Sequence, residues 1–213
     1  DDSLKRLQTD HVDLYYMHHI DRHVTWPEMW GVMEVLVNSG KATYIASSNF
    51  AGHDLVRAQW EADKRHFLGL VAEQHQYHLL SRLPELEVIP AARELGLGFV
   101  TYSPLAGGML GENALKRLSG SRGENRHYSE AMIKTLTDFA DFCRELGEKQ
   151  SDVAMAWILK NPVVTSPLIG PRTPEHLDNI LHALDVKLDD SAMKRLDEIF
   201  PGPGGEAPDS YAW

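Results

Sequence analysis

The chain has 213 residues, of which 43% are hydrophobic and 24% charged, a composition typical of globular proteins that bury a sizeable core. Its formal net charge of −10 argues against nucleic acid or an anionic membrane as a partner, because phosphate groups would repel such a surface. No run approaches the ~20 apolar residues of a membrane span, and no apolar leader opens the sequence. We therefore expect a cytoplasmic protein that binds any anion through a local site.

The single cysteine, Cys143, lies among apolar residues at helical spacing. One cysteine cannot form an internal disulfide, and a thiol on the apolar face of a helix is more often a core residue than a nucleophile. We predict that Cys143 is buried and inert, which suits a reducing compartment.

Five short apolar runs rich in β-forming residues recur along the chain, and each is followed by a helical pattern. The runs span residues 12–18, 42–48, 70–77, 98–103 and 163–170. Residues typical of helix starts and ends agree with this alternation. The predicted N-caps are Thr25, Ser151, Thr173 and Asp189, and Gly40 and Gly96 end two of the helices. Alternating strands and helices predict a parallel sheet with crossover helices.

Polar or special residues gather where each predicted strand ends. They are His18 and His19, Ser47 to Asn49, Gln74 to His78, Tyr102 to Pro104, and Gly170 to Arg172. In a parallel β/α barrel the site is built from the C-terminal ends of the strands, so the pattern favours a barrel over an open sheet. A closed barrel uses eight strands and ~250 residues, whereas five strands are counted here.

Six ordered motifs resemble those of the aldo-keto reductases. They are Asp13 to His18, Ser39 to Lys41, Ser48 to Phe50, Gln74 to Tyr77, Tyr102 to Gly108 and Ile169 to Thr173. The resemblance is strongest to the branch that includes potassium-channel β-subunits and bacterial oxidoreductases, among them nucleotide-sugar reductases. It implies a (β/α)8 TIM barrel of which this chain supplies about strands 4 to 8 and their helices, in one domain over residues 1–213 with a Pro/Gly-rich tail over 201–213.

The resemblance also implies reduction of a carbonyl by NADPH, with an Asp, Tyr, Lys and His tetrad near the nicotinamide. His18 matches the histidine, which orients the substrate and assists proton transfer. The other three members belong to strands that would precede Asp1, so no residue of this sequence is assigned to them. Tyr15 and Tyr16 are interpreted as core aromatics rather than substitutes, and His19 as a residue at the barrel mouth.

The cofactor-binding residues that the resemblance implies lie on the later strand ends. Ser48, Asn49 and Gln74 match side chains that bind the nicotinamide carboxamide, and Tyr102 matches the ring on which the nicotinamide stacks. The loop that would line the pyrophosphate contains Ser103, Pro104, Leu105, Ala106 and Gly107. Each of these residues taken singly is an ordinary loop or core residue, and only the joint pattern supports the assignment.

Gly170 and Arg172 precede a predicted helix N-terminus, where Arg172 could contact an adenosine 2′-phosphate, which favours NADPH over NADH. His176 stands where the family usually has Gln or Arg. Asn179 and Ile180 stand where it usually has Glu and Asn, so adenine recognition is expected to be altered. Arg122 or Arg126 could close over the phosphates, and a solvated loop is the alternative.

The histidines at positions 18, 19, 23, 75 and 78 lack the ligand spacing typical of zinc, so we expect no metal. Three interpretations of function remain open. The first is a reductase of aldehydes or ketones, with nucleotide-linked keto sugars as one substrate class. The second is a catalytically incomplete, cofactor-binding regulatory subunit, and the third is an inactive half-barrel that must pair with another protein.

The sequence does not determine which substrate the protein uses or whether it forms a homo-oligomer. So does the tail, where Tyr211 and Trp213 either belong to a disordered end or fold back near the barrel mouth or a neighbouring subunit.

Overall fold

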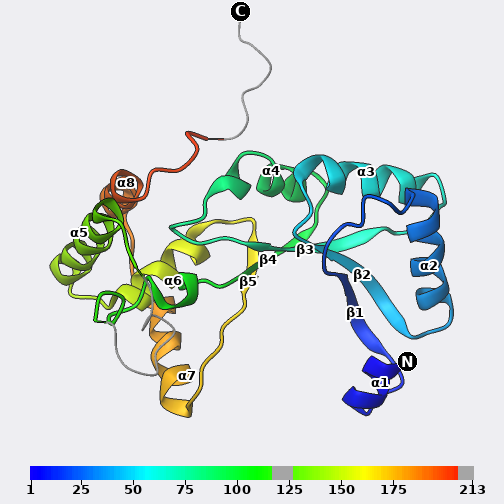
Figure 1. Cartoon of the computed structure of the whole chain (residues 1–213), viewed down its shortest axis with the longest axis horizontal. Coiled ribbons are helices and arrows are strands. Elements are labelled where there is room, and N and C mark those ends of the chain that lie inside the picture. Colours follow the sequence, from blue (N-terminus) through cyan, green and yellow to red (C-terminus); the bar gives the residue numbers. More distant parts are fainter. Residues whose placement is uncertain (117–126, 206–213) are drawn as a thin grey trace, which may run out of the picture. The chain divides into compact units, whose positions relative to one another are not determined.

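The computed structural model describes residues 1–116 and 127–205, in which each strand is followed by one or more helices, as predicted (Figure 1). The strands are β1 (Val12–Met17), β2 (Ala42–Ser48), β3 (Leu70–Gln76), β4 (Gly98–Tyr102) and β5 (Val164–Pro167). The helices are α1 (Asp2–Leu7), α2 (Trp26–Asn38), α3 (Gly52–Asp63), α4 (Val88–Glu94), α5 (Glu130–Leu146), α6 (Gln150–Lys160), α7 (Pro174–Leu181) and α8 (Asp190–Ile199). Short 3₁₀ turns cover Leu83–Glu85, Ala106–Gly108 and His182–Leu184.

The five strands hydrogen-bond in the order β1-β2-β3-β4-β5. β1 pairs with β2 in parallel, and β2 pairs with β3 in parallel. A doubly wound open sheet reverses its strand order at a switch point, whereas a β/α barrel keeps the order of the sequence. Across the described strands the order follows the sequence throughout, as expected for part of a barrel.

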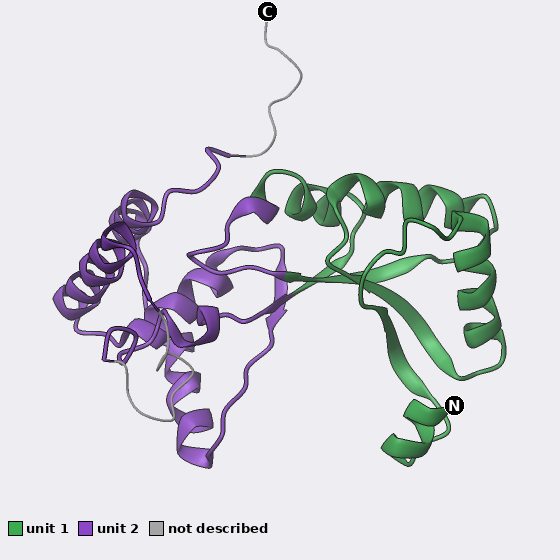
Figure 2. Cartoon of the chain, viewed as in Figure 1, with its two compact units in different colours: residues 1–75, 85–100, 206–213 green, residues 76–84, 101–205 purple. Residues whose placement is uncertain are grey.

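Contacts divide the chain into two compact units (Figure 2). Among the described residues, unit 1 comprises residues 1–75 and 85–100, and unit 2 comprises residues 76–84 and 101–205. Unit 1 therefore carries the ends of β1 and β2, and unit 2 carries α5 to α8.

The core of unit 1 is anchored by Trp30 of α2, which is fully buried. Its indole Nε1 donates a hydrogen bond to the carbonyl of Ala58 in α3 at 3.0 Å, and its ring meets Phe67 edge-on with centroids 5.6 Å apart. The ring is buried among apolar groups, and the hydrogen bond of its N–H fixes its orientation. Trp30 therefore holds α2 in place against α3.

In unit 2 aromatic rings join the helices. Phe139 of α5 packs edge-on against Phe200, which follows α8. The ring centroids of Trp157 in α6 and Tyr77 lie 5.0 Å apart. Cys143 of α5 is buried, and this burial raises the pKa of its thiol to about 12. The prediction of a core cysteine is therefore confirmed, and the raised pKa agrees with the expectation that the thiol is not a nucleophile.

Most predicted helix starts are confirmed by their caps. Thr25 accepts a hydrogen bond from the N–H of Glu28 at 3.4 Å, Thr173 from that of His176 at 3.2 Å, and Asp189 from that of Ala192 at 2.8 Å. None of the helices within 1–116 and 127–205 is long and apolar enough to cross a membrane.

Three local predictions are wrong. Ser151 does not cap α6, which begins at Gln150; the Ser151 hydroxyl instead donates to Glu112 Oε1 at 2.8 Å. β5 covers Val164–Pro167 rather than 163–170. Tyr15 is 40% exposed rather than in the core, and on its side of β1 the residues become buried only at Met17.

Candidate functional site

The C-terminal ends of β1, β2 and β3 bring four of the predicted site residues together in unit 1. The side-chain Nδ2 of Asn49 lies 3.2 Å from the carbonyl oxygen of His18 and 3.0 Å from the hydroxyl of Ser48. The backbone N–H of Asn49 donates to the carbonyl of Gln74 at 3.0 Å. The turn after β2 therefore links the residue after β1 to the end of β3 through a single asparagine.

Asn49 adopts a left-handed backbone conformation, with φ of 60°. Asparagine tolerates this region better than most residues with a Cβ, and non-glycine residues held there tend to cluster at functional sites. Phe50 follows and is fully buried, with its ring 6.4 Å from that of Trp26. The chain therefore turns sharply out of β2 at Asn49 and is anchored again one residue later.

Tyr16 contributes to this site, although the sequence indicated only a core aromatic. It is half-buried, and burial raises the pKa of its phenol, while a hydrogen bond with the Gln74 side chain acts in the opposite direction. The phenol therefore stays protonated at neutral pH and can hold the Gln74 amide. The signal in the sequence was position, because Tyr16 lies near the end of β1 and only two residues before His18.

The exposed rings of His18 and His19 lie 4.5 Å apart at the end of β1. The segment after them is tied down by Arg22, whose guanidinium donates to both carboxylate oxygens of Asp54 in α3, at 3.1 and 2.7 Å. The Asp54 carboxylate is 2% exposed and also accepts from the N–H of Ala51 at 3.3 Å. This bidentate pair joins the segment after His18 to the helix after Asn49, and the sequence reasoning missed it.

Unit 2 contains a cleft of about 770 Å³. Eight predicted cofactor-binding residues line it: Ser103, Pro104, Leu105, Gly107, Gly170, Arg172, His176 and Asn179. Tyr102, at the end of β4, and Ala106 lie in the same segment but are not part of the lining. The structure thus gathers most of the residues assigned to the pyrophosphate and adenosine ends into one concave surface.

The loop after β4 is tightly curled. Ser103, Ala106, Gly107 and Gly108 all have positive φ, at 57°, 49°, 63° and 95°. The N–H of Ala106 donates to the carbonyl of Ser103 at 2.7 Å, and that of Gly108 to the carbonyl of Leu105 at 2.8 Å. Successive backbone N–H groups in turn conformations can form concavities that bind anions, and the two non-glycine residues with positive φ in this loop carry strain. The N–H groups of Ala106 and Gly108 are therefore used within the loop, and its assignment to the pyrophosphate stays a prediction.

The N-terminus of α7 offers less to an anion than a typical helix start. Pro174, its first residue, has no N–H, and the N–H of His176 already donates to the side chain of Thr173. Most of the attraction for an anion must therefore come from the charge of Arg172, which is exposed at the cleft. Asn179, further along α7, accepts from Lys149 Nζ at 3.4 Å.

Two buried polar atoms in the cleft have no partner within the described residues. They are Oδ2 of Asp152 and the hydroxyl of Tyr128. Burial raises the pKa of Asp152, and Lys149, Ser151 and His182 act against that rise. Unsatisfied buried polar atoms are costly, so a ligand that carries hydrogen-bonding groups would fit this wall of the cleft.

One group of side chains in the described part of the chain has the geometry of metal ligands. Glu148, Asp152 and His182 each place a ligand atom within 4.8 Å of the others. His182 Nε2 lies 3.0 Å from Glu148 Oε2, so these two side chains already satisfy one another. None of the strand-end histidines belongs to this group, and the absence of a metal stays a prediction.

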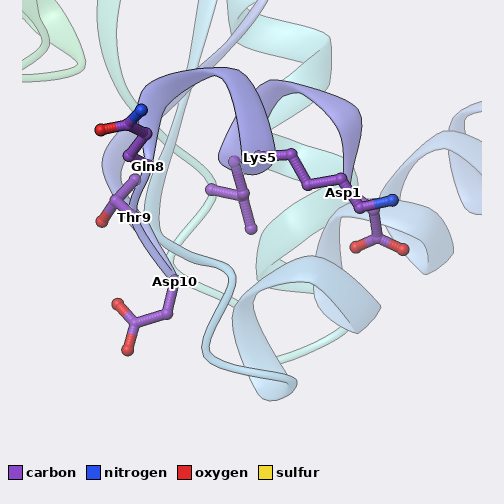
Figure 3. A pocket seen from close by; sticks show the side chains of 6 residues that line it. Asp1, Lys5, Gln8, Thr9 and Asp10 are labelled. Atoms are coloured by element: carbon purple, nitrogen blue, oxygen red, sulfur yellow. The ribbon is translucent and has the colours of Figure 1, made fainter.

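A shallow pocket of about 490 Å³ lies on α1 and the turn after it (Figure 3). Its labelled side chains, Asp1, Lys5, Gln8, Thr9 and Asp10, are all exposed, and they spread outward rather than converge. No predicted site residue lines this pocket, so we assign it no function. Arg122, Arg126, Tyr211 and Trp213 lie outside the described residues.

Comparison with known proteins places this geometry in a family. The model of the Aldo/keto reductase family matches residues 1–200. The chain is 57% identical over 212 residues to the uncharacterized oxidoreductase YrpG of Bacillus subtilis (strain 168), which covers 99% of this chain and 65% of that protein. It is 30% identical over 206 residues to the aldo-keto reductase AMT2 of Alternaria alternata, covering 93% of this chain and 55% of that protein.

A probable voltage-gated potassium channel subunit beta of Arabidopsis thaliana is 28% identical over 222 residues, covering 98% of this chain and 67% of that protein. The chain spans 65% and 55% of the lengths of YrpG and AMT2. The five-stranded α/β sheet in sequence order is therefore part of a (β/α)8 barrel. The match over residues 1–200 shows that the chain belongs to the aldo/keto reductase family.

Proposed function

We propose that this chain carries the histidine and most of the cofactor-binding residues of an NADPH-dependent carbonyl reductase. The observation that carries the proposal is the hydrogen bond from Asn49 to His18, with Ser48 and Gln74 around it. Membership in the aldo/keto reductase family supports a carbonyl-reducing oxidoreductase in general. NADPH as the cofactor and a nucleotide-linked keto sugar as one substrate class are parts of the proposal.

In this proposal the nicotinamide end lies at the strand ends of unit 1. A carboxamide needs both donors and acceptors, and the hydroxyl of Ser48 with the amides of Asn49 and Gln74 supplies both. When bound, the cofactor supplies the hydride. The exposed imidazole of His18 orients the carbonyl group of the substrate and assists proton transfer to its oxygen.

The phosphate-bearing end is assigned to the cleft of unit 2. The curled loop of Ser103 to Gly108 would present its backbone to the pyrophosphate, and Arg172 would pair with the 2′-phosphate. Since Pro174 and Thr173 leave little of the helix N-terminus for an anion, Arg172 is expected to dominate the preference for NADPH over NADH.

Titration of the natural full-length protein with NADPH, followed by nicotinamide fluorescence, tests the proposal. We expect saturable binding, and Arg172→Ala should raise the Kd for NADPH at least tenfold while changing the Kd for NADH less than twofold. Lys187→Ala, which changes a lysine that does not line the cleft, is the control. Absence of NADPH binding by the full-length protein would contradict the proposal.

The second candidate function is a cofactor-binding regulatory subunit without turnover. The similarity to a probable potassium channel subunit beta favours it, whereas His18 argues against it, because the resemblance implies a different residue there in those subunits. NADPH oxidation that depends on added aldehydes, ketones or nucleotide-linked keto sugars separates the two. Turnover that His18→Ala abolishes supports the reductase, and NADPH binding without turnover on any carbonyl supports the subunit.

We also propose a cytoplasmic location, on the acidic composition and the buried Cys143. The chain by itself is expected to lack turnover, because the resemblance assigns the tetrad's Asp, Tyr and Lys to none of its residues. Turnover by the 213-residue chain, abolished by His18→Ala, would contradict that expectation.

A further inference from the structure

Glu73 of β3 is a fully buried carboxylate beside the turn that carries Ser48 and Asn49. Its Oε2 accepts a hydrogen bond from the hydroxyl of Ser47 at 2.5 Å, and its Oε1 accepts from the backbone N–H of Phe50 at 3.1 Å. Ser47 and Phe50 are the residues immediately before and after the pair Ser48 and Asn49. One carboxylate therefore holds both ends of this two-residue segment.

The register of the sheet places Glu73 at this point. Ile45 of β2 lies opposite Leu70, but two residues later Ser47 lies opposite Glu73, so β3 contains one more residue than β2 over this interval. Without that irregularity Ser47 would face Ala72, and the carboxylate would point to the other side of the sheet. Bulges of this kind often redirect a side chain beside a functional site.

Stability alone does not account for a carboxyl group here. Burial of a carboxylate costs several kcal/mol unless it is paired, and apolar side chains of similar size are often tolerated at such positions at little cost. Within residues 1–116 and 127–205 a further partner is His75, whose Nδ1 lies 3.0 Å from Oε1 and whose side chain is 20% exposed. What the carboxylate provides that an apolar side chain cannot is two fixed acceptors on either side of Asn49, which is held at a φ of 60°.

We propose that Glu73 is a positioning residue that sets the geometry of Ser48 and Asn49 for the nicotinamide carboxamide. It acts through Ser47 and Phe50 and does not itself touch the cofactor. This inference rests on the proposed function, because it assigns a purpose to the segment that would bind the carboxamide.

The test compares two ligands on the natural full-length protein: NADPH, and 2′-phospho-ADP-ribose, which has the phosphates and adenosine but no nicotinamide. Glu73→Leu is expected to raise the Kd for NADPH at least tenfold and to change the Kd for 2′-phospho-ADP-ribose less than twofold. Glu73→Gln, which keeps an acceptor for Phe50, should recover most of the NADPH affinity. Leu55→Ala, in the core of the same unit, is the control for general destabilisation and should leave the ratio of the two constants unchanged.

A readout without ligand keeps this inference distinct from the proposed function. Hydrogen exchange at the amides of Asn49 and Phe50 should speed up at least tenfold in Glu73→Leu, while the amides of β1 exchange as in the wild type. If the wild type binds no NADPH but this local effect is seen, the proposed function fails and the positioning of the turn stands.

The inference is overturned if Glu73→Leu weakens both ligands in parallel, weakens neither, or leaves the exchange at Asn49 and Phe50 unchanged. Should Glu73→Leu fail to fold, Ser47→Ala removes one of the two contacts. It is expected to shift the ratio of the two dissociation constants at least threefold in the same direction, and an unchanged ratio would also overturn the inference.

Discussion

The side-chain amide of Asn49 donates a hydrogen bond to the backbone carbonyl of His18 across the ends of β2 and β1, with an N···O distance of 3.2 Å. The same amide lies 3.0 Å from the hydroxyl of Ser48. One residue with a left-handed backbone thus connects the histidine assigned to catalysis with the residues assigned to the nicotinamide. Replacement of Asn49 should therefore affect both the orientation of His18 and the binding of the cofactor.

Two replacements of Asn49 distinguish the effect of its side-chain contacts from the effect of its backbone strain. Asn49→Ala loses the amide and leaves a β-carbon at positive φ, so we expect a loss of about 1–3 kcal/mol in the free energy of unfolding. Asn49→Gly loses the same contacts but removes the strain. Both variants should raise the Kd for NADPH about tenfold in a fluorescence titration, and urea unfolding should show the smaller loss of stability for glycine. Wild-type affinity in Asn49→Gly would show that the amide does not bind the cofactor.

The pair of Arg22 and Asp54 should matter for stability because its carboxylate is 2% exposed. Arg22→Ala leaves this buried carboxylate without its bidentate partner, so we expect it to lower the free energy of unfolding more than the loss of an exposed partner does. The exposed pair of Arg195 and Glu198, 52% exposed on each side, is the control, and Arg195→Ala should cost less than about 1 kcal/mol. Equal effects of the two replacements in urea unfolding would contradict the structure.

Replacement of two glycines of unit 1 by alanine should change the free energy of unfolding in opposite directions. A β-carbon at Gly52 would lie 2.7 Å from Cβ and 2.9 Å from the carbonyl oxygen of Glu87, whereas one at Gly31 would meet only an Arg65 side-chain nitrogen at 3.9 Å. Gly52→Ala should therefore lower the free energy of unfolding by about 1–3 kcal/mol. Gly31→Ala, within α2, should raise it by about 0.5–1 kcal/mol through helix propensity. Thermal unfolding of the two variants beside the wild type measures both signs.

His78 should make unit 2 sensitive to acid. Burial lowers the pKa of its imidazole to about 4, against an ordinary value of 6.5, and its Nδ1 is buried with no partner among the described residues. As the pH falls from 6.5 to 4, the unfolded chain takes up a proton that the folded protein does not, so the free energy of unfolding should fall by about 3 kcal/mol.

His78→Gln removes this titration, so its free energy of unfolding should depend less steeply on pH between 6.5 and 4. Chemical denaturation at several pH values in that window provides the measurement. His23→Gln replaces an exposed histidine and should keep the wild-type slope. An unchanged slope in His78→Gln would show that the ring is not kept neutral by burial.

Local patterns predicted most of the secondary structure. β2 begins and ends where its apolar run does, and Thr25, Thr173 and Asp189 cap the helices expected to follow them. These features depend on residues within one turn of helix or one strand, so a single sequence contains them. The prediction failed for Ser151 because Glu112, 39 positions earlier, binds its hydroxyl.

The sequence by itself determined the alternation of strands and helices, the order of the strand-end motifs and, through that order, the family. Only the tertiary structure decided that Glu73 faces Ser47, that Arg22 pairs with Asp54, and that eight predicted residues share one cleft with Asp152, whose Oδ2 has no partner among the described residues. The physical reason is that strand and helix signals are local, whereas the partners of a buried carboxylate come from other elements and are set by sheet register and packing.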